Sequence, residues 1–186
     1  MPTVITHLAI PLAVGLGLGR RIVPGPLLAC GVAASVLPDL DVVGFKLGIA
    51  YAADLGHRGF SHSIVFALAV ALIAATILRS FRVPWATSFW FLLFALVSHS
   101  LLDACTTGGK GVALLWPFSG HRFFAPYQVI EVSPLSITRF MSDRGIAVLL
   151  SELYCVWMPS AALGTLLLGG RRLICCFVSN HRSSRP

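Results

Sequence analysis

Long runs of apolar residues divide this chain, and they constrain its fold more than any other feature. The run from Ile64 to Leu78 contains no charged residue, and comparable apolar runs cover residues 5–19, 27–37, 85–102 and 146–168. Such runs are typical of helices that cross a bilayer, because a helix satisfies its own backbone hydrogen bonds without water. We therefore predict an all-α, polytopic integral membrane protein with about five apolar helices.

The lengths of these runs predict helices of unequal reach. Residues 27–37 are bounded by Pro26 and Pro38, and they are too few for a full crossing, so we expect the second helix to be partial. A helix over residues 63–78 would rise ~24 Å, less than the roughly 30 Å thickness of the hydrocarbon core. The last helix is expected at residues 145–170, followed by a polar tail at residues 171–186, and the whole chain is expected to form a single domain.

Composition and charge agree with a membrane protein. The chain has 186 residues, of which 56% are hydrophobic and only 11% are charged, whereas soluble domains contain about 25% charged residues. The net charge of +7 is carried by basic residues that stand singly or in pairs, as expected of helix ends that anchor in lipid. We expect membrane lipids as partners and no nucleic acid.

One polar stretch stands out against this apolar background. His57-Arg58-Gly59-Phe60-Ser61-His62-Ser63 places two histidines, an arginine and two hydroxyls directly before an apolar helix. When successive helices cross the membrane alternately, three other polar segments return to the same side. These segments supply His7, the pair Asp39 and Asp41, and the pair His99 and Asp103. We therefore expect one polar cluster at one face of the membrane.

The chemistry of the expected cluster is that of metal ligands. His99 and Asp103 are four residues apart, so a helix presents both on one face. The candidate ligands are His7, Asp39, Asp41, His57, His62, His99 and Asp103. A catalytic zinc ion usually has about three protein ligands, so seven candidates suit two ions better than one. The nitrogen and oxygen donors favour one or two divalent transition-metal ions, Zn²⁺ above all, with Mn²⁺ or Fe²⁺ as alternatives.

Four residues are candidates for roles beside the metal. An aspartate that the ion does not fully engage, Asp39 or Asp41, can accept the proton of an attacking water. Arg58 and Arg122 can each bind phosphate oxygens of a substrate through two parallel hydrogen bonds. Arg58, which lies between the two histidines of the polar stretch, is a catalytic candidate as well. The alternative for both arginines is an interaction with lipid headgroups.

The distribution of arginines predicts the orientation. The side opposite the cluster carries no acidic residue. Its arginines are Arg20, Arg21, Arg79, Arg82, Arg171, Arg172, Arg182 and Arg185. By the positive-inside rule this side, with the C-terminus, is cytoplasmic, and the cluster faces outward.

Several motifs together resemble a known family. They are His7, Pro38-Asp39-Leu40-Asp41, the stretch His57 to Ser63, His99-Ser100-Leu101-Leu102-Asp103 and Leu115-Trp116-Pro117-Phe118-Ser119. Over residues 1–125 the chain is similar to the YdjM-type inner-membrane, metal-dependent hydrolases. The resemblance implies a multi-pass protein of the bacterial inner membrane with a metal-dependent hydrolase activity. In such a membrane, the orientation predicted from the arginines places the site on the periplasmic face. The His-x-x-x-Asp element is also similar to one in zinc-dependent phospholipases and nucleases, which implies a small-molecule or lipid phosphoester substrate.

Two other classes of protein compete with a hydrolase. A transporter or ion-binding protein would use His and Asp to relay ions, and a structural protein would use a metal only to join helices. A transport path predicts polar residues at several depths along the helices. Here they gather at one end, which favours the hydrolase.

Overall fold

The structure is a computed structural model that describes residues 1–134 and 136–183. Within these residues every regular element is a helix, and β-pairing is limited to two isolated bridges, Thr106 with Ile130 and Val112 with Phe123. The all-α prediction is confirmed. In chain order the elements are η1 (Val4–Leu8), α1 (Ala9–Leu18), α2 (Gly25–Ala34), η2 (Pro38–Val42), α3 (Val43–Lys46), η3 (Phe60–His62), α4 (Ile64–Arg79), α5 (Trp85–Ala104), α6 (Ile137–Phe140), α7 (Asp143–Glu152), η4 (Leu153–Trp157) and α8 (Met158–Ser183).

Three helical stretches in the described residues are long and apolar enough to cross a membrane, namely Gly25–Lys46, Trp85–Ala104 and Asp143–Ile174. Val4–Leu18 and Ile64–Arg79 are apolar but shorter. The second stretch reaches further than the sequence predicted. Residues 35–37 form a turn, and Pro38 then opens η2 at a position where a missing N–H costs nothing, so helical residues continue to Lys46.

The last helix is also longer than expected. Its first part, α7, passes through the π-helical turn η4 into α8, which continues to Ser183. Most of the expected polar tail is therefore helical, and residues 184–186 lie outside the described part. Arginine has a high helix propensity, so Arg171 and Arg172 mark a change of polarity without ending the helix.

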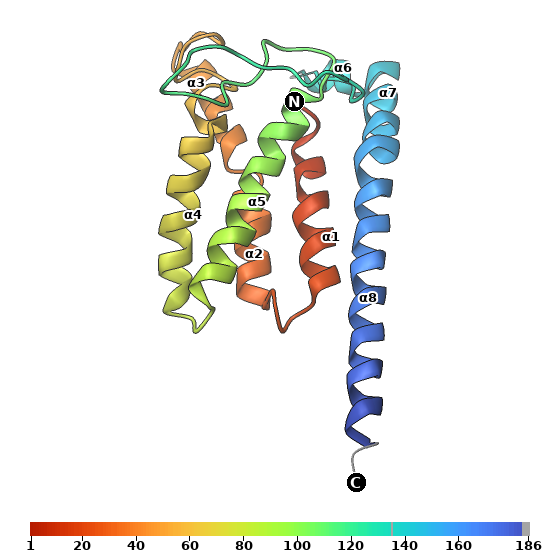
Figure 1. Cartoon of the computed structure of the whole chain (residues 1–186). Coiled ribbons are helices and arrows are strands. Elements are labelled where there is room, and N and C mark those ends of the chain that lie inside the picture. Colours follow the sequence, from red (N-terminus) through yellow and green to blue (C-terminus); the bar gives the residue numbers. More distant parts are fainter. Residues whose placement is uncertain (135, 184–186) are drawn as a thin grey trace.

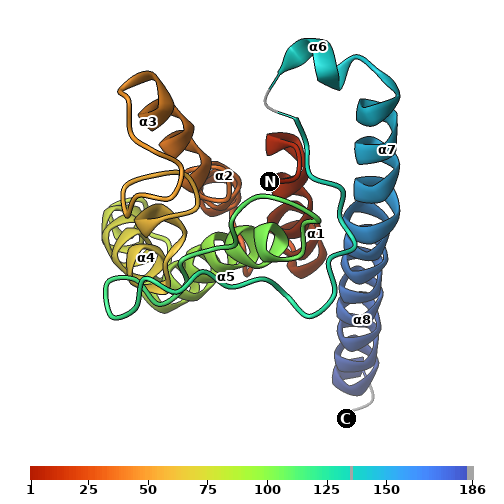
Figure 2. The ribbon, with the colours of Figure 1, turned by 90° about the horizontal axis from the view of Figure 1, so that it is seen from above.

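The helices α2, α4 and α5 share one hydrophobic core. Leu27, Leu92 and Leu96 are completely or almost completely buried in it. A Cβ at Gly31 would collide with the ring of Phe91, so a glycine is required for this approach of α2 to α5. The helix α1 packs between this group and α8. The contact with α8 runs along α1, and α8 extends beyond the end of α1 (Figure 1). From above, α8 lies at the edge of the bundle (Figure 2).

The connections at the two ends of the bundle differ. Short turns at residues 19–24 and 80–84 join helices at one end, whereas the long loops at residues 47–62 and 105–134 cover the other end together with the N-terminus (Figure 1). The ends of η1, η2, η3 and α5 meet beneath these loops. This is the end that holds the polar side chains.

Candidate metal centre

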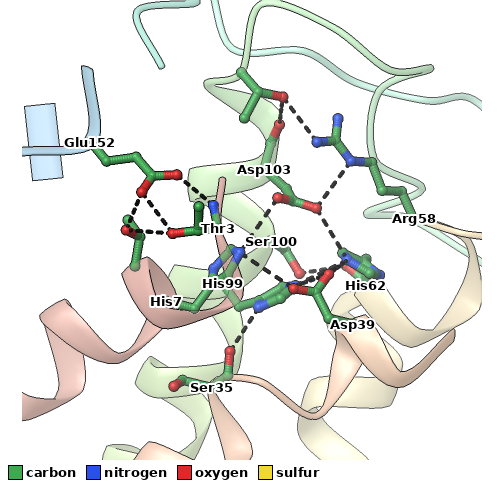
Figure 3. Close-up of polar contacts among 12 residues, drawn as sticks. Thr3, His7, Ser35, Asp39, Arg58, His62, His99, Ser100, Asp103 and Glu152 are labelled. Carbon is green, nitrogen blue, oxygen red and sulfur yellow. Dashed lines mark hydrogen bonds and ion pairs between the residues drawn. The ribbon is translucent and has the colours of Figure 1, made fainter. Parts of the chain in front are cut away.

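Four polar side chains converge from three short stretches that are distant in sequence (Figure 3). Asp39 lies on η2, His62 ends η3, and His99 and Asp103 lie on the last turns of α5. Each can offer one ligand atom, and these four atoms all lie within 4.8 Å of one another. The sequence spacing predicted that His99 and Asp103 lie on one face of a helix, and both side chains do point to the same place from α5. The four residues are called the metal group below.

The distances within the metal group fit one ion. Nε2 of His62 lies 3.0 Å from Nε2 of His99 and 3.3 Å from Oδ2 of Asp103, and Nε2 of His99 lies 3.6 Å from Oδ1 of Asp39. Two ligand atoms about 2.1 Å from a tetrahedral ion are roughly 3.4 Å apart. A zinc-sized ion therefore fits among these atoms.

Hydrogen bonds outside the metal group decide which histidine nitrogens carry a proton. Nδ1 of His99 lies 2.7 Å from the carbonyl oxygen of Ser35, and a carbonyl only accepts, so Nδ1 carries the proton and Nε2 keeps its lone pair. Nδ1 of His62 lies 3.2 Å from Oδ2 of Asp41, which fixes the same tautomer. The two Nε2 lone pairs face each other and repel unless a cation or a proton lies between them.

The neighbouring carboxylates determine how readily His62 takes up that proton. Burial disfavours its charged form, but the close carboxylates of Asp103 (3.3 Å) and Asp41 (3.2 Å) outweigh burial and raise the pKa of His62 to about 9. A metal ion must therefore compete with a proton at this nitrogen.

Several buried atoms at the centre lack a hydrogen-bond partner within the described residues. They are both ring nitrogens of His7, both carboxylate oxygens of Asp39, both carboxylate oxygens of Asp103 and Nε of Arg58. His7, His99 and Asp103 have no exposed surface, and Asp39 is 6% exposed. A buried carboxylate without a partner costs several kcal/mol. Arg58 offsets part of this cost at Oδ2 of Asp103, from which its Nε lies 3.0 Å away, and a bound cation would remove the rest. The oxygens of Asp39 and Oδ1 of Asp103 therefore indicate a metal site.

Asp41 and His57, two further candidate ligands, lie behind the metal group. Nδ1 of His57 is 2.6 Å from Oδ1 of Asp41, and Oδ2 of Asp41 accepts hydrogen bonds from the Ser61 hydroxyl (2.7 Å) and the Arg58 backbone N–H (3.0 Å). Both oxygens of Asp41 are thus occupied. Its position suits a residue that orients His62, because metal-bound histidines usually donate their second N–H to a carboxylate.

Arg58 does not point outward as a substrate-binding group would. Its side chain is fully buried; Nε lies 3.0 Å from Oδ2 of Asp103, and its two terminal nitrogens donate to Thr106 and to the Gly108 carbonyl. Its backbone φ of 62° is unusual for a residue other than glycine. The structure gives Arg58 the role of holding Asp103.

Arg122 is likewise engaged in the fold. Its guanidinium donates to the backbone carbonyls of His57, Tyr51 and Ala53 at 3.0–3.4 Å. These bonds fasten the segment before the histidine stretch. Neither arginine is free to bind phosphate in this conformation.

Hydrogen bonds that sequence reasoning did not assign hold η1, the element that carries His7. Glu152 is buried and accepts hydrogen bonds from the N–H and hydroxyl of Thr3 (Figure 3) and from the hydroxyl of Thr6. The hydroxyl of Thr6 also accepts a hydrogen bond from Nε1 of Trp157. These contacts join η1 to the last helix. An acidic residue within an apolar helix was the available signal for Glu152.

The fold and the site together define a class: a helical membrane protein with a buried His/Asp group that can hold a metal ion. The chain belongs to the YdjM inner membrane protein family, whose model matches residues 1–178. The resemblance seen in the motifs is therefore confirmed, and it extends beyond residue 125.

Similar proteins occur in Escherichia coli and Bacillus subtilis. The inner membrane protein YbcI of Escherichia coli K12 is 51% identical over 173 residues, which cover 92% of this chain and all of YbcI. The inner membrane protein YdjM of the same organism is 32% identical over 149 residues, 75% of this chain and 67% of YdjM. The uncharacterized protein YvsG of Bacillus subtilis is 28% identical over 101 residues, half of this chain and 59% of YvsG. No solved structure matches the chain.

Proposed function

We propose that this protein is a membrane-embedded, metal-dependent hydrolase that acts on a phosphoester, either a lipid or a small molecule at the membrane surface. The observation that carries the proposal is the buried metal group, in which two histidine lone pairs and two buried carboxylates face one point. A divalent ion bound there supplies an acidified water and a charge that polarises a phosphoryl oxygen.

The protein residues have distinct roles in this proposal. His62, His99, Asp39 and Asp103 hold the ion, and the Ser35 carbonyl and Asp41 orient the two imidazoles. With one ion bound through Oδ1 of Asp39, the other oxygen of this carboxylate is the candidate proton acceptor, because both oxygens of Asp41 are occupied by hydrogen bonds.

Several lines support the substrate class. Residues of the metal group lie at the loop-covered end of a bundle with apolar spans, so a membrane substrate is close at hand. Zn²⁺, Mn²⁺ and Fe²⁺ all suit the two-nitrogen, two-oxygen donor set. Sites of this kind act on oxygen-rich esters.

A second candidate is a membrane protein that binds an ion without catalysis. Near-complete burial of the metal group favours it, because structural metal sites are closed whereas catalytic sites keep an open position.

Metal content and hydrolysis, measured together, separate the two candidates. We expect purified protein to contain at least one transition-metal ion per chain and to cleave lipid or nucleotide phosphodiesters, with loss of cleavage on chelation. His99→Ala should lose both properties, and the matched control His121→Ala, in an exposed position away from the group, should keep both. Bound metal without cleavage of any phosphoester would leave only the ion-binding function. Absence of metal from the wild type would contradict both.

A further inference from the structure

The two carboxylates of the metal group each turn one oxygen away from the histidine pair. Asp39 points Oδ1 toward His99 and Oδ2 toward His7, where the distance to Nε2 is 3.7 Å. Asp103 points Oδ2 toward His62 and Oδ1 toward the same nitrogen of His7, again at 3.7 Å. The outward oxygens and His7 therefore enclose a second point beside the first.

His7 is itself a buried residue without a partner. It has no exposed surface, and neither of its ring nitrogens has a hydrogen-bond partner among the described residues. Its ring stacks on that of His99, with the ring centroids 3.8 Å apart. A neutral imidazole always carries one N–H and one lone pair, and leaving both without a partner is costly in a buried position. A second cation gives the Nε2 lone pair a partner.

We infer that Nε2 of His7, Oδ2 of Asp39 and Oδ1 of Asp103 hold a second divalent transition-metal ion, and that both carboxylates bridge the two ions. The distances of 3.7 Å are close to the ~3.4 Å separation of two ligands on a tetrahedral ion. Metal ions in two-metal sites are roughly 3.5–4 Å apart, a spacing that bridging carboxylates maintain. With three protein ligands, the second ion keeps open positions.

The net charge of the centre indicates which kind of ligand would fill the open positions of the second ion. Asp39, Asp41 and Asp103 bring three negative charges to the centre, and Arg58 brings one positive charge. With neutral histidines, one divalent ion balances this charge and a second makes the centre cationic. An anionic ligand is then favoured, as a phosphoester would be. This last step rests on the proposed function, whereas the number of ions does not.

Metal stoichiometry tests the second site. We expect elemental analysis of the detergent-purified wild type, reconstituted with Mn²⁺ and freed of excess metal, to give about two ions per chain. His7→Ala should retain about one ion, and His121→Ala should retain two. One ion in the wild type, or two in a folded His7→Ala protein, would overturn the inference. A wild type that binds one ion and still cleaves phosphoesters would overturn the second site and leave the proposed function intact.

Electron paramagnetic resonance tests the same inference without any variant. Two Mn²⁺ ions bridged by carboxylates should give an exchange-coupled spectrum in the fully loaded wild type. The hyperfine pattern of isolated Mn²⁺ at full loading would refute the bridged pair, even if His7→Ala failed to fold.

Discussion

At the scale of single residues, the centre is held by a layer of hydrogen bonds behind the metal group. Asp41 fixes His62 and His57, Ser35 fixes His99, and Arg58 pairs with Asp103. Each of these contacts fixes either the tautomer of a histidine or the direction of a metal-ligand atom before an ion binds. Such preorganisation reduces the cost of arranging the donors when a metal binds.

The buried pair of Arg58 and Asp103 leads to a prediction on stability. Arg58→Met removes the guanidinium and leaves a fully buried carboxylate, so we expect a loss of about 3–5 kcal/mol in the free energy of unfolding of the metal-depleted protein. The measurement is unfolding of the purified protein in detergent after chelator treatment.

A surface ion pair provides the control for this prediction. Arg144 and Glu131 lie 2.8 Å apart, with side chains 43% and 36% exposed, and Arg144→Ala should cost no more than about 1 kcal/mol. Equal losses in the two variants would contradict the assignment of Arg58 as a buried support for Asp103.

At the scale of elements, the contact between α1 and α8 positions the N-terminal part of the site. A Cβ on Gly164 would lie 2.9 Å from the Ala13 carbonyl oxygen, and a Cβ on Gly17 would lie 2.8 Å from that of Gly164. Small residues let membrane helices approach closely and gain dispersion contacts. Glu152 is the last residue of α7, which continues through η4 into α8. It accepts hydrogen bonds from Thr3 and Thr6, and Thr6 precedes His7 in the chain.

This close approach predicts different effects for two glycines of α8. Gly164→Val should push α8 away from α1 and lower the free energy of unfolding by about 1–3 kcal/mol, since overpacking forces the backbones apart. Gly169→Val should have almost no effect, because a Cβ there meets no atom within 4 Å. Thermal unfolding of both variants in detergent provides the measurement, and indistinguishable midpoints would argue against the α1–α8 contact.

At the scale of the whole molecule, the metal group and the long loops share one end of the bundle, and the opposite end carries Arg20, Arg21, Arg79 and Arg82. We propose that the arginine-bearing end is cytoplasmic and that the metal group opens toward the periplasm, in accord with the positive-inside rule.

Labelling of single cysteines tests this orientation. In a background without the native cysteines, Gly120→Cys at the loop end should react with a membrane-impermeant maleimide in intact spheroplasts. Gly25→Cys at the arginine end should react only after permeabilisation. Both positions are exposed and have room for a side chain. The reverse pattern would place the metal group on the cytoplasmic side.

Much of this architecture could be predicted from the sequence because it depends on local patterns. Apolar runs locate membrane helices, and alternate crossing brings His7, Asp39, His62, His99 and Asp103 to one end whatever the details of packing. The helix lengths predicted from the sequence were less accurate. Neither Pro38 nor Arg171 ends a stretch of helix, because each suits a helical position in its own context.

The sequence by itself determined the class of protein and the set of polar residues that gather at one end of the bundle. Only the tertiary structure decided how those residues divide their roles. Asp39 and Asp41 are two residues apart in one motif, and the packing of η2 against η3 turns the first toward His99 and the second toward His57. Arg58 is buried because its partners come from residues about fifty positions later. Contacts between segments so distant in sequence depend on how the helices pack, which no local pattern encodes.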